Sequence, residues 1–275
     1  MLVATLLAAL LAAAPAPAAP VPAHDAAWQA LEPGLESALL DGPPGAPGDG
    51  KIAVVRVDPA RFELRLLNAS APGQGAPLSA RAWAARAGAS AAINASMYQQ
   101  DYRTSVSLMR TRDHVNQRHL SKDRVALMFD PIDRTLPPVR LVDRDCEELD
   151  RVAHAYGTVV QSIRMLSCER KNVWSPSPQR TSVAAIGVDG AGRVLFIHAR
   201  SAWPVHDLVD ALLALPLDLR QAMYVEGGPE AQLYARGGGG EVERLGAYVN
   251  APAAETRDGW PVPNVIAAVK KKGKR

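Results

Sequence analysis

The sequence predicts a single domain of the α+β or mixed α/β class, with a mixed β-sheet, several hairpins and flanking helices. Apolar runs of strand length alternate along the chain with runs of helical periodicity. Glycine and proline turns, rather than helices, separate several of the strands, which argues against a strict β-α-β series. The chain has 275 residues, of which 48% are hydrophobic, so it is long enough to bury a sizeable core.

The first half of the predicted domain begins with two strand-like runs at residues 51–68. They are joined at Asp58-Pro59, which predicts a hairpin. Ser79 and Gly88 are typical of the two ends of a short helix between them. The elements expected next are a strand at 90–98, strands at 125–129 and 139–142, and a helix through 147–157.

The clearest predicted element of the second half is a hairpin at residues 180–200. Two apolar strands flank the turn Asp189-Gly190-Ala191-Gly192, whose glycines can adopt positive φ. An amphipathic helix at 205–217 should follow. The elements expected after it are strands at 219–225, 232–235 and 245–249, with a flexible glycine loop at 237–240, and a last strand at 264–270.

Residues 1–23 predict a secretory signal peptide and leader. No charged side chain precedes Asp25, and the apolar run after Met1 is too short to span a bilayer. Small residues at cleavage spacing place the mature start at Ala19 or His24. The alternative is an Ala/Pro leader that is retained and disordered. We therefore expect a secreted or periplasmic protein with no stable membrane span after signal cleavage.

The rest of the chain divides into three parts. Residues 24–50 form an N-terminal segment that ends in a Pro/Gly linker, residues 51–270 form the folded domain, and residues 271–275 form a basic tail. The last six residues hold five of the 31 basic side chains, so the other 26 roughly balance the 28 acidic ones. Because no basic cluster is interleaved with aromatic residues, we expect no nucleic-acid partner. The tail is expected to be a solvated end, or less favourably a weak contact to an anionic surface.

Cys146 and Cys168 are the only cysteines. In an exported protein an even pair separated by a modest loop favours a disulfide. The alternatives are two buried free thiols, or a zinc site with His154 as the nearest histidine in sequence.

Several familiar catalytic patterns are missing from the sequence. It contains no G-x-S-x-G elbow, no S-x-x-K and no H-E-x-x-H, and the glycine run at 237–240 lacks the lysine of a P-loop. His114 and His119 do not have the i, i+4 spacing of helical metal ligands. No cofactor is predicted, although scattered carboxylates such as Asp101 or Asp143 leave a divalent metal open.

Polar residues follow three apolar strands at the point where each strand begins or ends. Asn94 ends one strand, Arg180 begins another, and Glu226 ends a third, with Glu230 four residues later. These residue types can orient a ligand, bind an anion through a fork of donors, and act as acid, base or nucleophile. Each also has a structural alternative as a turn cap, a surface arginine or a solvated turn residue.

The order of three motifs, "INASMY", "RTSVAAIGVDGAGRVLFI" and "YVEGGPEAQL", resembles the phosphodiester glycosidase family. The likeness covers roughly residues 51–270. The family shows an N-G-G-F-F-like strand end, an R-x-A-I-G strand and a D-G-G-G-S motif after a helix. The chain departs from it at Ala95 and Ser96 in place of glycines, at Glu226 in place of aspartate, and at Pro229-Glu230 in place of Gly-Ser.

The resemblance implies an exported hydrolase that cleaves a sugar-1-phosphodiester bond in a glycan or glycoconjugate. It assigns catalysis to Glu226 and Arg180, and substrate binding to Asn94, Gly227 and Gly228. From the residues themselves we add Glu230 as a second catalytic carboxylate, and Ser96 and Tyr98 of the first motif as substrate-binding residues. Two alternatives remain, namely a non-catalytic envelope protein that binds phosphorylated polysaccharide, and a metal-assisted hydrolase of other specificity that uses Asp101 or Asp143.

Overall fold

The computed structural model describes residues 28–249 and 258–272. The predicted signal peptide at 1–23 lies outside the described residues, as does most of the basic tail. The folded part begins earlier than the sequence predicted, because two strands that precede the Pro/Gly segment already belong to a sheet.

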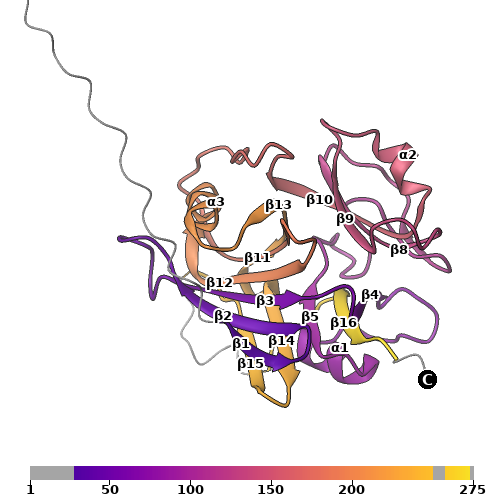
Figure 1. Ribbon diagram of the computed structural model, residues 1–275, viewed down its shortest axis with the longest axis horizontal. Helices are drawn as coiled ribbons and strands as arrows, with labels where there is room; N and C mark the ends of the chain where they lie inside the picture. The colour runs from indigo at the N-terminus through magenta and orange to yellow at the C-terminus, as the bar shows by residue number, and fades with distance from the viewer. Residues whose placement is uncertain (1–27, 250–257, 273–275) are drawn as a thin grey trace, which may run out of the picture.

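The strands form two antiparallel sheets (Figure 1). The larger sheet has the order β1 (Gln29–Glu32), β2 (Leu35–Asp41), β3 (Lys51–Val57), β12 (Val194–Pro204), β11 (Arg180–Asp189), β13 (Leu219–Gly227), β10 (Tyr156–Leu166), β6 (Met109–Arg110) and β7 (Val115–Gln117). β8 (Val125–Pro131) also pairs with β10, and β9 (Val139–Asp143) pairs with β8. The smaller sheet has the order β15 (Gly240–Leu245), β14 (Gln232–Gly237), β5 (Ala91–Asn94), β16 (Asn264–Lys270) and β4 (Phe62–Asn68).

The predicted α+β or mixed α/β class is wrong, because the protein is mostly β. All strand pairs of the described residues are antiparallel, and the α-helices found there are short: α1 (Ala80–Ala87), α2 (Leu149–Ala153) and α3 (Val205–Ala214). The main error lies at 147–157, where the helix ends early and the chain enters the long strand β10 at Tyr156. Antiparallel strands need only tight turns between them, so few crossover helices are required.

The two sheets pack face to face over one core, and a helix covers each outer face. Side chains of both sheets meet in this core, for example Ile186 and Phe196 from the larger sheet with Ile93 and Ile266 from the smaller one. α3 packs on the other face of the larger sheet, and α1 lies on the far side of the smaller sheet (Figure 1). This four-layer arrangement fixes the strand ends that carry the predicted site.

Several connections between strands differ from those predicted from the sequence. β3 and β4, predicted as one hairpin, belong to different sheets, and the turn at Asp58 carries the chain from one sheet to the other. A strand was expected at 245–249, but β15 ends at Leu245. The glycine run at 237–240 is the turn of the β14–β15 hairpin.

The hairpin predicted at 180–200 is confirmed. β11 and β12 pair along most of their length, and Asp189 stabilises the turn by accepting hydrogen bonds from the backbone of Ala191 and Arg193. Helix α1 is also confirmed, with Ser79 as its N-cap and Gly88 at φ 61° after its last residue.

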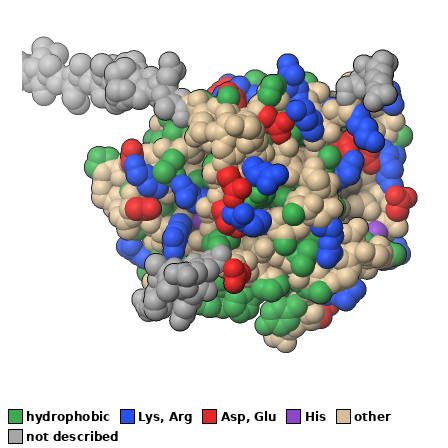
Figure 2. Space-filling model, turned by 90° about the horizontal axis from the view of Figure 1, so that it is seen from below, with side chains coloured by type: hydrophobic (Ala, Val, Ile, Leu, Met, Phe, Trp, Pro, Cys, Tyr) green, Lys and Arg blue, Asp and Glu red, His purple; other side chains and the backbone are tan. Residues whose placement is uncertain are grey.

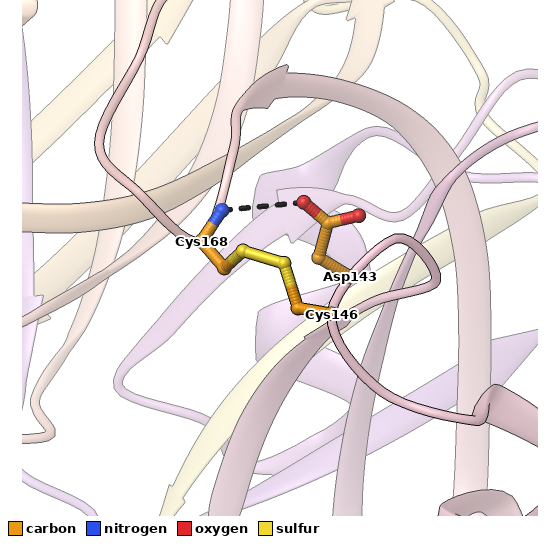
Figure 3. Close-up of side chains that lie close together, drawn as sticks. All are labelled: Asp143, Cys146 and Cys168. Carbon is orange, nitrogen blue, oxygen red and sulfur yellow. Dashed lines mark hydrogen bonds between the residues drawn. A yellow bond between two sulfur atoms is a disulfide. The ribbon is translucent and has the colours of Figure 1, made fainter.

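Cys146 and Cys168 form the predicted disulfide, with their Cα atoms 6.7 Å apart (Figure 3). The alternatives of free thiols and of a zinc site are therefore wrong. The carboxylate of Asp143 lies beside the bridge, where it accepts a hydrogen bond from the backbone of Cys168 at 3.2 Å and pairs with Arg164 at 2.7 Å. Closing a loop of 22 residues stabilises the fold by about 3 kcal/mol in the chain-entropy model.

None of the helices in the described ranges is long and apolar enough to cross a membrane. On the face that Figure 2 shows, basic side chains are scattered among acidic ones.

Candidate active site

The site is built where β11 begins and β13 ends, because these antiparallel neighbours bring the second and third motifs together. Val183 pairs with Gly227 and Ala184 with Glu226, after which the register shifts so that Ala185 faces Tyr224. This irregularity places an extra residue in β13 next to Glu226. Bulges of this kind re-aim side chains at the ends of strands.

A cavity of about 560 Å³ opens at these strand ends. Five of the predicted site residues line it: Arg180, Glu226, Gly227, Gly228 and Glu230. The structure therefore brings the predicted catalytic residues into one cavity. Asn94, Ser96 and Tyr98 are not among its lining residues.

Glu226 is the most perturbed carboxyl group of the cavity. Burial raises its pKa to about 7, a hydrogen bond from the Gly227 amide to its Oε1 at 3.0 Å opposes the rise, and the neighbouring charge of Glu230 adds to it. Partial burial also raises the pKa of Glu230. Two carboxyl groups that interact in this way release their protons in separate steps.

Close packing explains the glycines of the third motif. A side chain at Gly227 would come within 2.4 Å of the Tyr224 hydroxyl and 2.7 Å of Thr181 Oγ1. Gly228 has φ 63° and donates its amide to Thr181 Oγ1 at 2.8 Å. Both amides therefore bond within the protein, and the glycines shape the turn that carries Glu230.

Arg180 lies exposed at the mouth of the cavity. It forms no ion pair with another described residue, whereas many arginines of the chain do. A guanidinium placed in this way is a candidate for binding an anion such as phosphate.

Tyr98 lies beside Glu230 rather than in the cavity. Burial raises the pKa of its phenol, and the charges of Glu230 and Glu226 raise it further, so the group stays protonated. Its buried hydroxyl has no partner at standard hydrogen-bond geometry among the described residues, but it interacts with the Glu230 carboxyl and lowers the pKa of that group. Tyr98 therefore presents a donor to the carboxyl pair.

Asn94 and Ser96 support the site from behind. Asn94 is buried and accepts a hydrogen bond from the backbone of Gln232 at 3.0 Å, two residues after Glu230. Ser96 is also buried and donates to the carbonyl of Gln161 at 3.3 Å. Both side chains hold backbone in place, and neither faces the cavity.

The other residues that line the cavity were not predicted from the sequence, and they include Thr181, Trp174, Tyr224 and Tyr248. The ring centroids of Trp174 and Tyr224 lie 5.2 Å apart, and Tyr224 is the first residue of the third motif. Thr181 was visible as the neighbour of Arg180, and Trp174 as a lone aromatic residue in a polar, proline-containing loop.

The two carboxylates considered as metal ligands are already engaged by the protein. Asp101 accepts hydrogen bonds from the backbone of Arg103 and Thr104, both at 2.9 Å, and Asp143 pairs with Arg164 beside the disulfide. Among the described residues, the cluster of possible metal-ligating side chains is Asp143, Cys146 and Cys168. Its sulfur atoms are bonded to each other.

Two carboxyl groups share one cavity, on a two-sheet β fold, with an arginine that forms no ion pair to another described residue, and such a set of groups can combine acid–base chemistry with anion binding. The chain belongs to the phosphodiester glycosidase family, whose sequence pattern matches residues 87–269. The family resemblance drawn from the three motifs is therefore confirmed, and the family is one of hydrolases.

Two solved structures share the fold. The catalytic domain of zebrafish N-acetylglucosamine-1-phosphodiester α-N-acetylglucosaminidase, auto-inhibited by its pro-peptide, has a TM-score of 0.63 at 12% identity, over 90% of this chain and 87% of that one. A hypothetical protein from Synechocystis has a TM-score of 0.60 at 11% identity, over 87% of this chain and 62% of that one. A comparison with curated protein sequences finds no match.

Proposed function

We propose that the protein hydrolyses a sugar-1-phosphodiester bond, releasing a free sugar and a phosphate monoester. The observation that carries this proposal is the raised pKa of Glu226, about 7, in the same cavity as Glu230 and Arg180. Family membership supports a hydrolase of this class.

Glu226 acts as the general acid. It is the more deeply buried of the two carboxyl groups, and the charge of Glu230 helps to keep its proton in place. The leaving group is a phosphate monoester, whose second pKa is about 6. A carboxyl group with a pKa of about 7 is matched to protonating that oxygen near neutral pH.

Glu230 is the second carboxylate. It is less buried than Glu226, so it ionises first and can activate the attacking water or attack the sugar itself. The distance between two such carboxyl groups around a bound sugar distinguishes inversion from retention. Arg180 binds the phosphate through its fork of donors.

Export remains part of the proposal. Disulfides persist in secreted and periplasmic proteins, and the Cys146–Cys168 bridge supports such a location. The substrate is then a phosphorylated sugar or polysaccharide outside the cytoplasm.

The test is a product assay on a panel of sugar-1-phosphodiesters with Glu226→Gln and Arg180→Ala. Loss of the acid should lower kcat by about a hundredfold or more. Loss of the charged phosphate contact should lower kcat/KM by about tenfold or more. Two exposed substitutions away from the cavity, Glu169→Gln and Arg134→Ala, serve as matched controls and should leave turnover unchanged.

The assignment fails if both site variants match the wild type. Tight substrate binding without turnover by the wild type would instead favour the non-catalytic alternative. Activity that survives exhaustive chelation would count against the metal-assisted alternative.

A further inference from the structure

Three aromatic side chains are strongly exposed in the described part of the chain: Tyr102, Tyr248 and Trp260, at 58%, 60% and 41%. Aromatic residues are scarce in this protein, at 5% of the sequence. Exposed apolar surface that is gathered in one region, rather than scattered, marks an interaction site.

Tyr248 lies at the cavity of the carboxyl pair, and the other two exposed aromatic residues are connected to that pair through Tyr98. Tyr248 lines the cavity together with Glu226. Tyr102 stacks against Tyr98 with ring centroids 5.7 Å apart, and Tyr98 lies beside Glu230. Trp260 also lies close to Tyr98.

The aromatic residues form two groups that meet at Glu230. The cavity group consists of Trp174, Tyr224 and Tyr248, on the side of Glu226 and Arg180. The outer group consists of Tyr98, which lies beside Glu230 outside the cavity lining, and of Tyr102 and Trp260, which lie beside Tyr98. Glu230 lines the cavity and also contacts the outer group, so the binding surface continues past the carboxyl pair.

The outer group is held in place by a structured turn. Tyr102 has φ 55°, a backbone conformation that costs a residue with a side chain free energy. Asp101 fixes this turn by accepting hydrogen bonds from Arg103 and Thr104, and Gln99 donates to the carbonyl of Thr104 at 2.7 Å. The fold therefore holds the exposed Tyr102 in a defined turn.

Flat aromatic rings match the apolar C–H face of a pyranose, and their polar atoms can contact its hydroxyl groups. Rings on both sides of a carboxyl pair suit a chain of sugars rather than a single sugar. The exposed guanidinium of Arg180 adds a place for a phosphate of that chain.

We infer that the site binds a glycan chain of several sugar units joined by phosphodiesters, with sugars on both sides of the bond that is cut. The outer group holds sugars on one side of that bond, and the cavity group holds those on the other. This inference rests on the proposed function, because it names the substrate class of the same site.

The test compares an oligomer of four or more hexoses joined by 1-phosphodiester bonds with the methyl ester of the hexose 1-phosphate. The wild type should show at least a tenfold higher kcat/KM on the oligomer. Tyr102→Ala and Trp260→Ala should each lower the oligomer-to-monomer ratio by about five- to tenfold. Ile132→Ala, an exposed apolar residue outside both groups, should leave the ratio unchanged.

Equal kcat/KM on the two substrates, or a ratio that neither aromatic substitution changes, would overturn the inference while the proposed function stood. If neither substrate is cleaved, the proposed function fails, and calorimetric titration of the oligomer decides the inference separately. Binding that weakens in Tyr102→Ala and Trp260→Ala but not in Ile132→Ala supports it. No binding, or binding that all variants share, overturns it.

Discussion

At the scale of single residues, Glu226 determines how activity should respond to pH. Its raised pKa of about 7 means that the proton needed for acid catalysis is present below that pH and lost above it. We therefore expect kcat/KM to fall as the pH rises through about 7, by tenfold for each further pH unit in the limiting region. A pH–rate profile of the wild type checks this.

The residual activity of Glu226→Gln should lack this alkaline limb, because glutamine has no proton to lose. Glu169→Gln, an exposed substitution, should keep it. A wild-type profile that stays level or rises to pH 9 would assign the acid role to another group.

At the scale of elements, the disulfide joins the loop after β9 to the loop after β10. Both cysteines are exposed, so a reductant can reach them. Reduction should lower the free energy of unfolding by about 3 kcal/mol, because the open chain gains conformational entropy when it unfolds. Urea unfolding with and without reductant measures the change.

The Cys146→Ala, Cys168→Ala double variant is the control for that experiment. It should show the lowered stability without reductant and no response to it. Equal stability of the oxidised and reduced wild type would mean that the bridge contributes nothing measurable.

Elements whose signal is local could be predicted from the sequence. The turn at Asp189-Gly190-Ala191-Gly192 and the caps of α1 depend on residues within a few positions, and both were found. No strand was predicted where β10 lies: the helix expected at 147–157 covers its start, and the strand is defined by its pairing with β6, β8 and β13. Whether β3 pairs with β4 likewise depends on tertiary contacts and not on the local sequence.

The residues of the candidate site also divide into those that the sequence identifies and those whose role only the fold decides. Arg180, Glu226 and Glu230 could be recognised as polar residues at strand ends, and the sheet register then brings them together. Asn94 has the same sequence signal, yet its strand lies in the other sheet and its amide oxygen binds the Gln232 backbone. Position at a strand end indicates a buried or functional role without distinguishing between the two.

At the scale of the whole molecule, two buried groups should oppose each other in how stability depends on pH. His198 lies fully buried on β12, with its Nε2 3.0 Å from the Ala231 carbonyl, and burial lowers its pKa from 6.5 to about 4. Its contribution to stability is present above pH 6.5 and is lost as the pH falls through about 4. Glu226 has a pKa raised from 4.5 to about 7, so its contribution is present below pH 4.5 and is lost as the pH rises through about 7.

Each contribution amounts to about 3 kcal/mol. Between pH 4.5 and 6.5 the contribution of His198 grows as the pH rises while that of Glu226 shrinks, so the two pH dependences largely cancel in the wild type. Glu226→Gln removes one of them: at pH 8 the variant should be more stable than the wild type by up to about 3 kcal/mol, and this advantage should vanish near pH 4.5. The variant's own stability should fall as the pH drops below 6.5, because the loss of the His198 contribution is then not offset by a gain from Glu226.

Urea unfolding across this range measures both effects, with Glu169→Gln expected to follow the wild type. An advantage of Glu226→Gln that does not depend on pH would show that Glu226 carries no raised pKa in the folded protein.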